Sequence, residues 1–73
     1  MRVLVIEDDG EVASYIQKAL KESGHASSLA ADGEIGFTMA LAGDYDVLVI
    51  DRMLPKLDGL SLIRLLRDEN INA

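Results

Sequence analysis

The sequence predicts an α/β fold in which helices cover a small parallel sheet. Two short apolar runs, at residues 3–6 and 47–50, are rich in β-branched side chains and lack polar alternation, as is typical of strands buried on both faces. Stretches with apolar residues at helical spacing lie between and after these runs. The resulting alternation of strand and helix is the order expected of a parallel sheet with helical crossovers.

The first half of the chain is expected to supply two strands and one helix. After the first apolar run, a helix is predicted over residues 10–23, because apolar side chains recur on one stripe and Gly24 follows as a stop. Residues 25–30 are expected to form a more polar strand, which suits the edge of a sheet. The stripe of the helix consists of Val12, Ile16, Ala19 and Leu20.

The second half is expected to supply two helices and the remaining strand. One helix is predicted over residues 33–42 with Ile35, Met39 and Ala42 on its apolar side, and Gly43 follows its end. After the second apolar run, a loop containing Pro55 leads into a helix at about 59–69. The apolar side of this last helix is expected to consist of Leu62, Ile63, Leu65 and Leu66.

The handedness of crossovers predicts how these elements are arranged. Parallel strands are joined by right-handed connections. If the chain steps outward to the second strand and then returns past the first, the strand order is 2-1-3, with the first two helices on opposite faces. In such open sheets, ligands bind beyond the carboxyl ends of the strands, at the point where the strand order reverses.

Acidic residues follow the two strands that meet at this point. Glu7, Asp8 and Asp9 come after the first strand, and Asp51 comes after the third. Two carboxylates about 5 Å apart repel by roughly 3 kcal/mol at an effective dielectric constant of 20, so such a cluster either holds protons or binds a cation. Hard oxygen ligands favour magnesium or calcium over zinc. A carboxylate beside such a cation can also attack a phosphoryl group, which gives an aspartyl phosphate.

Composition excludes several classes of function. The 73 residues allow one domain, and a net charge of −6 argues against direct binding of nucleic acid by this segment. There is no cysteine, so no thiolate metal site or disulfide is possible. No apolar run has the length of a signal peptide core or a membrane span, which leads us to expect a cytoplasmic protein without membrane contact.

The chemically informative segments occur in a recognisable order along the chain. They are Val3-Leu4-Val5-Ile6-Glu7-Asp8-Asp9, Ala31-Asp32-Gly33, Asp51-Arg52-Met53-Leu54-Pro55 and Asp58-Gly59. Together they resemble the receiver domain of two-component response regulators, especially those with a C-terminal winged-helix DNA-binding domain. The resemblance covers the whole chain and implies a flavodoxin-like fold, with residues 1–73 forming the N-terminal part of a receiver that is truncated after its third helix.

The resemblance also implies roles for individual residues. Asp51 matches the phosphoacceptor, and Asp8 matches the direct ligand of Mg²⁺. Glu7 matches an acidic neighbour that acts on the metal through water, and the backbone carbonyl of Met53 matches the third protein ligand. Asp9 lies one place beyond this pattern and is expected to start the first helix. The implied phosphodonor is a sensor histidine kinase, and the chain would be a phosphoacceptor and not an enzyme.

The sequence departs from the receiver pattern at its C-terminal end. Strands 4 and 5 are absent, and with them the Ser or Thr and the Lys of the family site, which puts phosphotransfer in doubt. The third strand, residues 47–50, would then form an unprotected apolar edge. We therefore predict a homodimer in which the sheet continues across paired third strands.

Three alternative functions compete with a working receiver. A haloacid dehalogenase-type phosphatase would need a second acid two residues after Asp51, where this chain has Met53. A dinucleotide-binding half-domain would need a glycine-rich turn where this chain has Glu7, Asp8 and Asp9. The third alternative is a truncated or engineered half-domain that self-associates and has little or no phosphotransfer activity.

Overall fold

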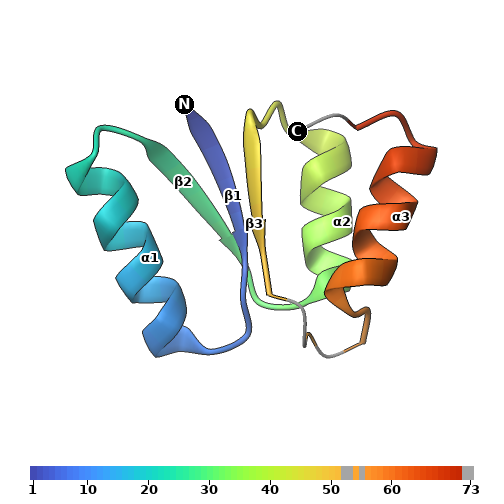
Figure 1. Cartoon of the computed structure of the whole chain (residues 1–73), viewed down its shortest axis with the longest axis horizontal. Coiled ribbons are helices and arrows are strands. Elements are labelled where there is room, and N and C mark those ends of the chain that lie inside the picture. The colour runs from blue at the N-terminus through green and yellow to red at the C-terminus, as the bar shows by residue number, and fades with distance from the viewer. Residues whose placement is uncertain (52–53, 55, 72–73) are drawn as a thin grey trace.

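The computed structural model describes residues 1–51, 54 and 56–71 of the chain. Strands and helices alternate, and α1 lies on one side of the sheet while α2 and α3 lie on the other (Figure 1). The elements are β1 (Arg2–Ile6), α1 (Gly10–Glu22), β2 (Ala26–Ala30), α2 (Gly33–Ala42), β3 (Val47–Ile50) and α3 (Gly59–Asp68). The predicted element order is confirmed, and the boundaries shift by no more than one residue at any end.

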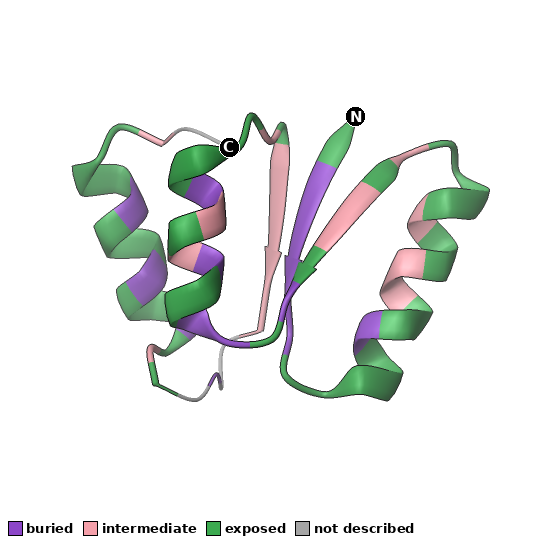
Figure 2. Ribbon diagram, turned by 180° about the vertical axis from the view of Figure 1, so that it is seen from behind, coloured by how far each residue is buried: buried purple, intermediate pink, exposed green. Residues whose placement is uncertain are grey.

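The three strands form a parallel sheet in the order β2-β1-β3, as the handedness argument predicted. The register pairs Arg2 of β1 with Ala26 of β2, and it pairs Val3 of β1 with Val47 of β3. β1 is therefore central, and its residues 3–6 are almost completely buried. The four residues of β3 are only half-buried (Figure 2), because no further strand borders β3 in the described part of the chain.

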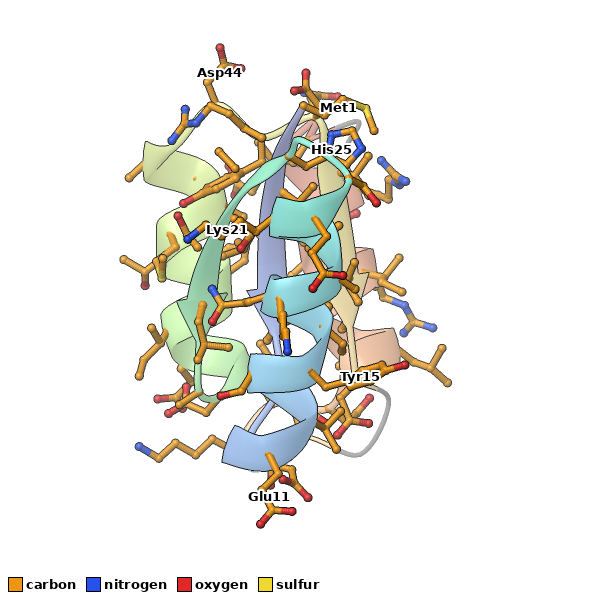
Figure 3. The ribbon with its side chains drawn as sticks, turned by 90° about the vertical axis from the view of Figure 1, so that its left-hand side faces the viewer. Met1, Glu11, Tyr15, Lys21, His25 and Asp44 are labelled. Carbon is orange, nitrogen blue, oxygen red and sulfur yellow. The ribbon has the colours of Figure 1, made fainter. Side chains whose placement is uncertain are left out.

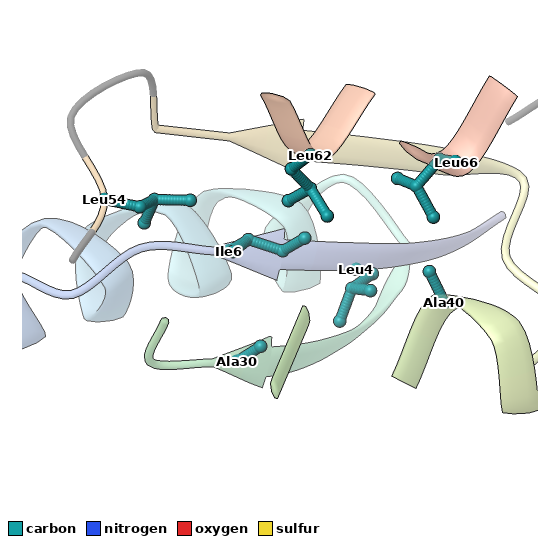
Figure 4. Packing of buried hydrophobic residues seen from close by; sticks show 7 residues of the cluster. All are labelled: Leu4, Ile6, Ala30, Ala40, Leu54, Leu62 and Leu66. Atoms are coloured by element: carbon teal, nitrogen blue, oxygen red, sulfur yellow. The ribbon is translucent and has the colours of Figure 1, made fainter. Parts of the chain in front are cut away.

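The apolar core lies between the sheet and the pair α2 and α3. Leu4 and Ile6 of β1 meet Leu62 and Leu66 of α3 there, and Leu54 closes the cluster near the end of β3 (Figure 4). The side chains of Leu4, Ile6 and Leu62 are fully buried. Within the described ranges, no helix combines the length and the apolar character that crossing a membrane requires.

Each helix is directly preceded by an aspartate whose side chain accepts hydrogen bonds from backbone N–H groups of the first turn. Asp9 caps α1 by accepting from the backbone N–H of Glu11 and Val12, which confirms its predicted place at the helix start. Asp32 caps α2 and Asp58 caps α3 in the same way. Such caps satisfy N–H groups that lack a partner within the helix, and each typically stabilises a helix by about 1 kcal/mol.

The buried face of α2 differs from the prediction. Ile35 was expected on the apolar side but is 46% exposed, whereas Gly36 and Ala40 are buried. A Cβ on Gly36 would lie 2.6 Å from Cδ1 of Ile6, so the absence of a side chain lets α2 approach β1 closely. The helix therefore packs through small residues, and Ile35 faces outward.

The buried faces of α1 and α3 are narrower than predicted. In α3, Leu62 and Leu66 are buried while Ile63 and Leu65 remain partly exposed, as the single contact face of the helix requires. In α1, Ala13 is the buried residue, and Val12 is 42% exposed. These helices bury one narrow stripe each because each packs on one side only.

Candidate metal and phosphoacceptor site

The acidic residues meet because β1 and β3 are adjacent and end in register. Ile6 pairs with Ile50, so the next residues, Glu7 and Asp51, leave the sheet side by side. The backbone N–H of Asp51 donates to the carbonyl of Ile6 at 2.9 Å, and that of Glu7 donates to the carbonyl of Ala30 at 3.0 Å. The backbone thus fixes both residues at the carboxyl edge of the sheet before their side chains make any contact.

Three carboxylates gather at this edge. Glu7, Asp8 and Asp51 each offer a carboxylate oxygen, and these oxygens lie within 4.8 Å of one another. Asp8 is exposed, whereas Glu7 is 9% exposed and Asp51 is half-buried. The convergence of acids from distant segments, expected from the sequence, is therefore present.

The other two carboxylates of the cluster raise the pKa of Glu7. A hydrogen bond with the Asp51 side chain, burial, and repulsion from Asp51 and Asp8 together raise the pKa of Glu7 from 4.5 to about 7. Its Oε2 atom is buried and has no hydrogen-bond partner among the described residues. A buried carboxylate oxygen without a partner is costly, so the site favours either a proton or a cation at Glu7.

The ligand chemistry fits a hard divalent cation. All three groups are carboxylates, and the described residues place no sulfur or imidazole ligand among them. Mg²⁺ is typically bound through one or two carboxylates and keeps positions for water and phosphate oxygens. The partial exposure of Asp8 and Asp51 leaves such positions accessible to solvent.

Other residues singled out by the sequence have different places. Met53, predicted to supply a carbonyl ligand, lies outside the described residues. Asp9 serves the helix cap described above. His25 lies beside Met1 at the opposite end of the molecule from Glu11 (Figure 3), with its Nδ1 3.2 Å from the terminal nitrogen, and so takes no part in the acidic cluster.

The ion pair between Lys56 and Asp32 was not predicted. Nζ of Lys56, whose side chain is 61% exposed, lies 3.6 Å from Oδ2 of Asp32. The sequence signal was the Ala31-Asp32-Gly33 step, which indicated a helix start without indicating a partner.

Comparison with protein families identifies the family to which the chain belongs. The model of the response regulator receiver domain matches residues 3–73. The chain belongs to the response regulator receiver domain family. Membership of this family accounts for the fold and for the strand order.

Individual relatives support this assignment. The transcriptional regulatory protein CusR of Escherichia coli K12 is 39% identical over 70 residues, which cover 96% of this chain and 31% of that protein. The receiver domain of the Francisella response regulator 1452 is 42% identical with a TM-score of 0.94, over 97% of this chain and 59% of the other. The chain thus spans about a third of the length of this regulator and somewhat more than half of the solved receiver.

A further solved receiver carries a metal. The receiver domain of the sensor histidine kinase PA1611 of Pseudomonas aeruginosa PAO1 was solved with a magnesium ion coordinated in its active site cleft. It is 33% identical to this chain with a TM-score of 0.88. The match covers 92% of this chain and 55% of the PA1611 receiver chain.

Proposed function

We propose that this receiver accepts a phosphoryl group on Asp51 with Mg²⁺ bound by Glu7, Asp8 and Asp51. The proposal rests on one observation above all, the convergence of these three carboxylates at the carboxyl edge of β1 and β3. The magnesium ion seen in the PA1611 receiver supports the choice of cation. When bound, Mg²⁺ would neutralise the cluster and lower the repulsion between Asp51 and an anionic donor.

The three acidic residues would have different roles, which follow from their positions and their burial. An Asp51 carboxylate oxygen forms the bond to phosphorus, while the bond from phosphorus to the donor atom breaks and its electron pair leaves with the donor. Asp8, the exposed member, would hold the cation from the solvent side. Glu7, the buried member, would act on the cation directly or through water, and its unpartnered Oε2 would gain a partner.

The chain would act as a stoichiometric acceptor. Transfer leaves the phosphoryl group covalently attached to Asp51, so each chain takes up one group and is not regenerated by the same step. The product is a modified protein that serves as a signal. This role fits a phosphoacceptor and not an enzyme with a free product.

Mass spectrometry tests the proposal directly. We expect incubation with Mg²⁺ and a small-molecule phosphodonor to add one phosphoryl mass to the chain, and we expect Asp51→Asn to abolish the addition. Glu34→Gln, at an exposed acid in the first turn of α2, is the matched control and should still accept the group. Absence of a mass shift in the unaltered chain would overturn the proposal.

The partners follow from the family and its relatives. We infer that the physiological phosphodonor is a sensor histidine kinase, and that in a longer regulator this segment leaves DNA contact to another domain. CusR is a transcriptional regulatory protein and supports this inference. A regulator that acts on DNA works where the chromosome lies, so we place this function in the cytoplasm.

We also propose that the 73-residue chain can self-associate through β3. The observation that favours this is an apolar groove of about 150 Å³ along β3 and α3. Its lining residues are Leu48, Ile50, Ile63, Leu66, Arg67 and Ile71. A two-fold axis would pair the β3 edges antiparallel and cover both grooves.

Light scattering of the purified chain tests this association. A dimer is expected, and Ile63→Asp, which places a charge in the groove, should shift it toward monomer. Leu60→Asp is the control, because Leu60 is 58% exposed on the same helix and does not line the groove. A chain that stays monomeric at high concentration would contradict the proposal.

A further inference from the structure

Lys56 has a backbone conformation that residues other than glycine rarely adopt. Its φ is +67°, within the left-handed region. The residue lies in the connection between β3 and α3, which begins at Asp51. A strained residue persists only where its surroundings hold it, so the neighbours of Lys56 indicate its role.

The side chain of Lys56 meets a carboxylate whose orientation is already set. Oδ1 of Asp32 accepts a hydrogen bond of 2.8 Å from the backbone N–H of Ile35, as the cap of α2. Oδ2 of the same carboxylate lies 3.6 Å from Nζ of Lys56. The Asp32 side chain is 12% exposed and that of Lys56 is 61% exposed, so the ion pair joins a nearly buried carboxylate to a solvated ammonium group.

A second contact holds the same stretch of backbone. A Cβ on Gly33 would overlap the carbonyl oxygen of Leu57 and lie 2.8 Å from the Cβ of Leu57. The first turn of α2 therefore lies directly against Leu57, and glycine at position 33 is what permits this approach. Asp58 follows as the cap of α3, with Oδ1 accepting from the N–H of Ser61 at 3.0 Å.

Asp51 and Leu54, two residues that precede Lys56, are also held by contacts with the rest of the molecule. The backbone N–H of Asp51 donates to the carbonyl of Ile6, and Leu54 is buried in the core cluster. Of the described residues that follow Leu54, Lys56 and Leu57 contact the start of α2. Asp51 of the acidic edge thus lies only five and six residues before Lys56 and Leu57, which contact the start of α2.

We propose that Lys56 and Asp32 are positioning residues whose ion pair holds residues 56–58 against the start of α2 and thereby raises the affinity of the acidic site for a divalent cation. The inference rests on the proposed function, since Mg²⁺ is its probe. Neither residue is a proposed ligand. They act through the described residues 54 and 56–58, which follow Asp51 in the chain.

If Lys56 acted only through its charge, removing that charge would change the affinity for Mg²⁺ in the opposite direction. Removing a positive charge near a cluster of carboxylates makes the local potential more negative, which should strengthen binding of Mg²⁺. Loss of positioning should weaken it. The direction of the change in a variant without the lysine charge therefore separates the two accounts.

Calorimetric titration of the 73-residue chain with Mg²⁺ provides the first measurement. We expect Lys56→Gly to weaken binding about threefold to fivefold, the range that one ion pair can supply. Its melting temperature should be unchanged or higher, because glycine relieves the positive φ. Asn70→Gly is the matched control, since Asn70 also has a positive φ of 60° but lies after α3, and its affinity should not change.

Two conservative variants identify the ion pair as the cause. Lys56→Arg keeps the charge and the reach to Asp32, so it should retain the affinity of the unaltered chain. Asp32→Asn keeps a side chain that caps α2 well but loses the ion pair, so it should weaken binding as Lys56→Gly does. Unchanged or tighter binding in Lys56→Gly would overturn the proposal.

Amide hydrogen exchange without metal gives a second readout that does not depend on the cation. Lys56→Gly and Asp32→Asn should speed exchange at Leu54 and Leu57 severalfold while leaving amides of α1 unchanged. If exchange at these amides does not change, the positioning role is wrong. If the unaltered chain binds no Mg²⁺ yet exchange responds as expected, the proposed metal site fails and the positioning of the connection stands.

Discussion

The Asp51 side chain raises the pKa of Glu7 to about 7, with burial of Glu7 contributing in the same direction. Asp51 and Glu7 follow paired residues of neighbouring strands, so the sheet itself holds the two acids together. Repulsion between them is stored in the folded chain and is absent when the chain unfolds. A cation or a proton at Glu7 relieves it.

The first prediction concerns stability and pH in the absence of divalent cations. The pKa of Glu7 is higher in the folded chain, about 7, than its ordinary value of 4.5, so the folded state binds more protons between these values. Stability should therefore be fully present below about pH 4.5 and fall as the pH rises toward and through 7. We expect a loss of roughly 1 to 3 kcal/mol, measured by urea unfolding between pH 5 and 8 in the presence of EDTA.

A matched variant assigns this pH dependence to one residue. Glu7→Gln removes the titrating group and should flatten the fall in stability over the same range. If the unaltered chain instead grew more stable from pH 5 to 8, the assignment of a raised pKa to Glu7 would be wrong.

The second prediction concerns magnesium and thermal stability. A cation that binds only the folded chain raises its stability, by about 2.7 kcal/mol at a concentration one hundred times the dissociation constant. Because Glu7 must lose its proton to act as a ligand, the rise in melting temperature with Mg²⁺ should be larger at pH 8 than at pH 6. Equal shifts at both pH values would show that Glu7 takes no part in binding.

The sequence was sufficient for the strand order and for the acidic cluster. Both depend on rules that act over whole elements, namely right-handed crossovers and the meeting of parallel strand ends at one edge. Once β1 and β3 were placed side by side, Glu7 and Asp51 had to meet. Their separation along the chain therefore did not hinder the prediction.

The buried face of α2 could not be predicted in the same way. Apolar size suggested Ile35, but the helix packs through Gly36 and Ala40, because β1 presents the bulky Ile6 at that point. Whether the helix or the strand contributes the large side chain at a contact depends on both elements together. The sequence of either segment alone does not show it. The ion pair of Lys56 with Asp32 was missed for the same reason.

The third prediction tests this close approach. Gly36→Ala adds a Cβ that would lie 2.6 Å from Cδ1 and 2.9 Å from Cγ1 of the fully buried Ile6. We expect a loss of about 1 to 3 kcal/mol in the free energy of unfolding, despite the better helix propensity of alanine. Gly10→Ala is the control, since a Cβ there would meet nothing within 4 Å, and it should be neutral or stabilising. Equal effects of the two substitutions would argue against close packing of α2 on β1.

The fourth prediction concerns α3, whose residues differ in burial although their chemistry is similar. Leu62 is fully buried against the sheet, whereas Leu65 on the same helix is 39% exposed. Leu62→Ala removes buried methyl groups and leaves a cavity, so we expect a loss of about 2 to 5 kcal/mol.

Leu65→Ala makes the same chemical change at the partly exposed position. It should cost less than about 1.5 kcal/mol, because 39% of Leu65 already lies exposed to water in the folded state, so less apolar surface is lost from burial than at Leu62. Parallel urea unfolding of both variants measures the difference. If the two losses were similar, α3 would pack through a wider face than the burial of Leu62 and Leu66 indicates.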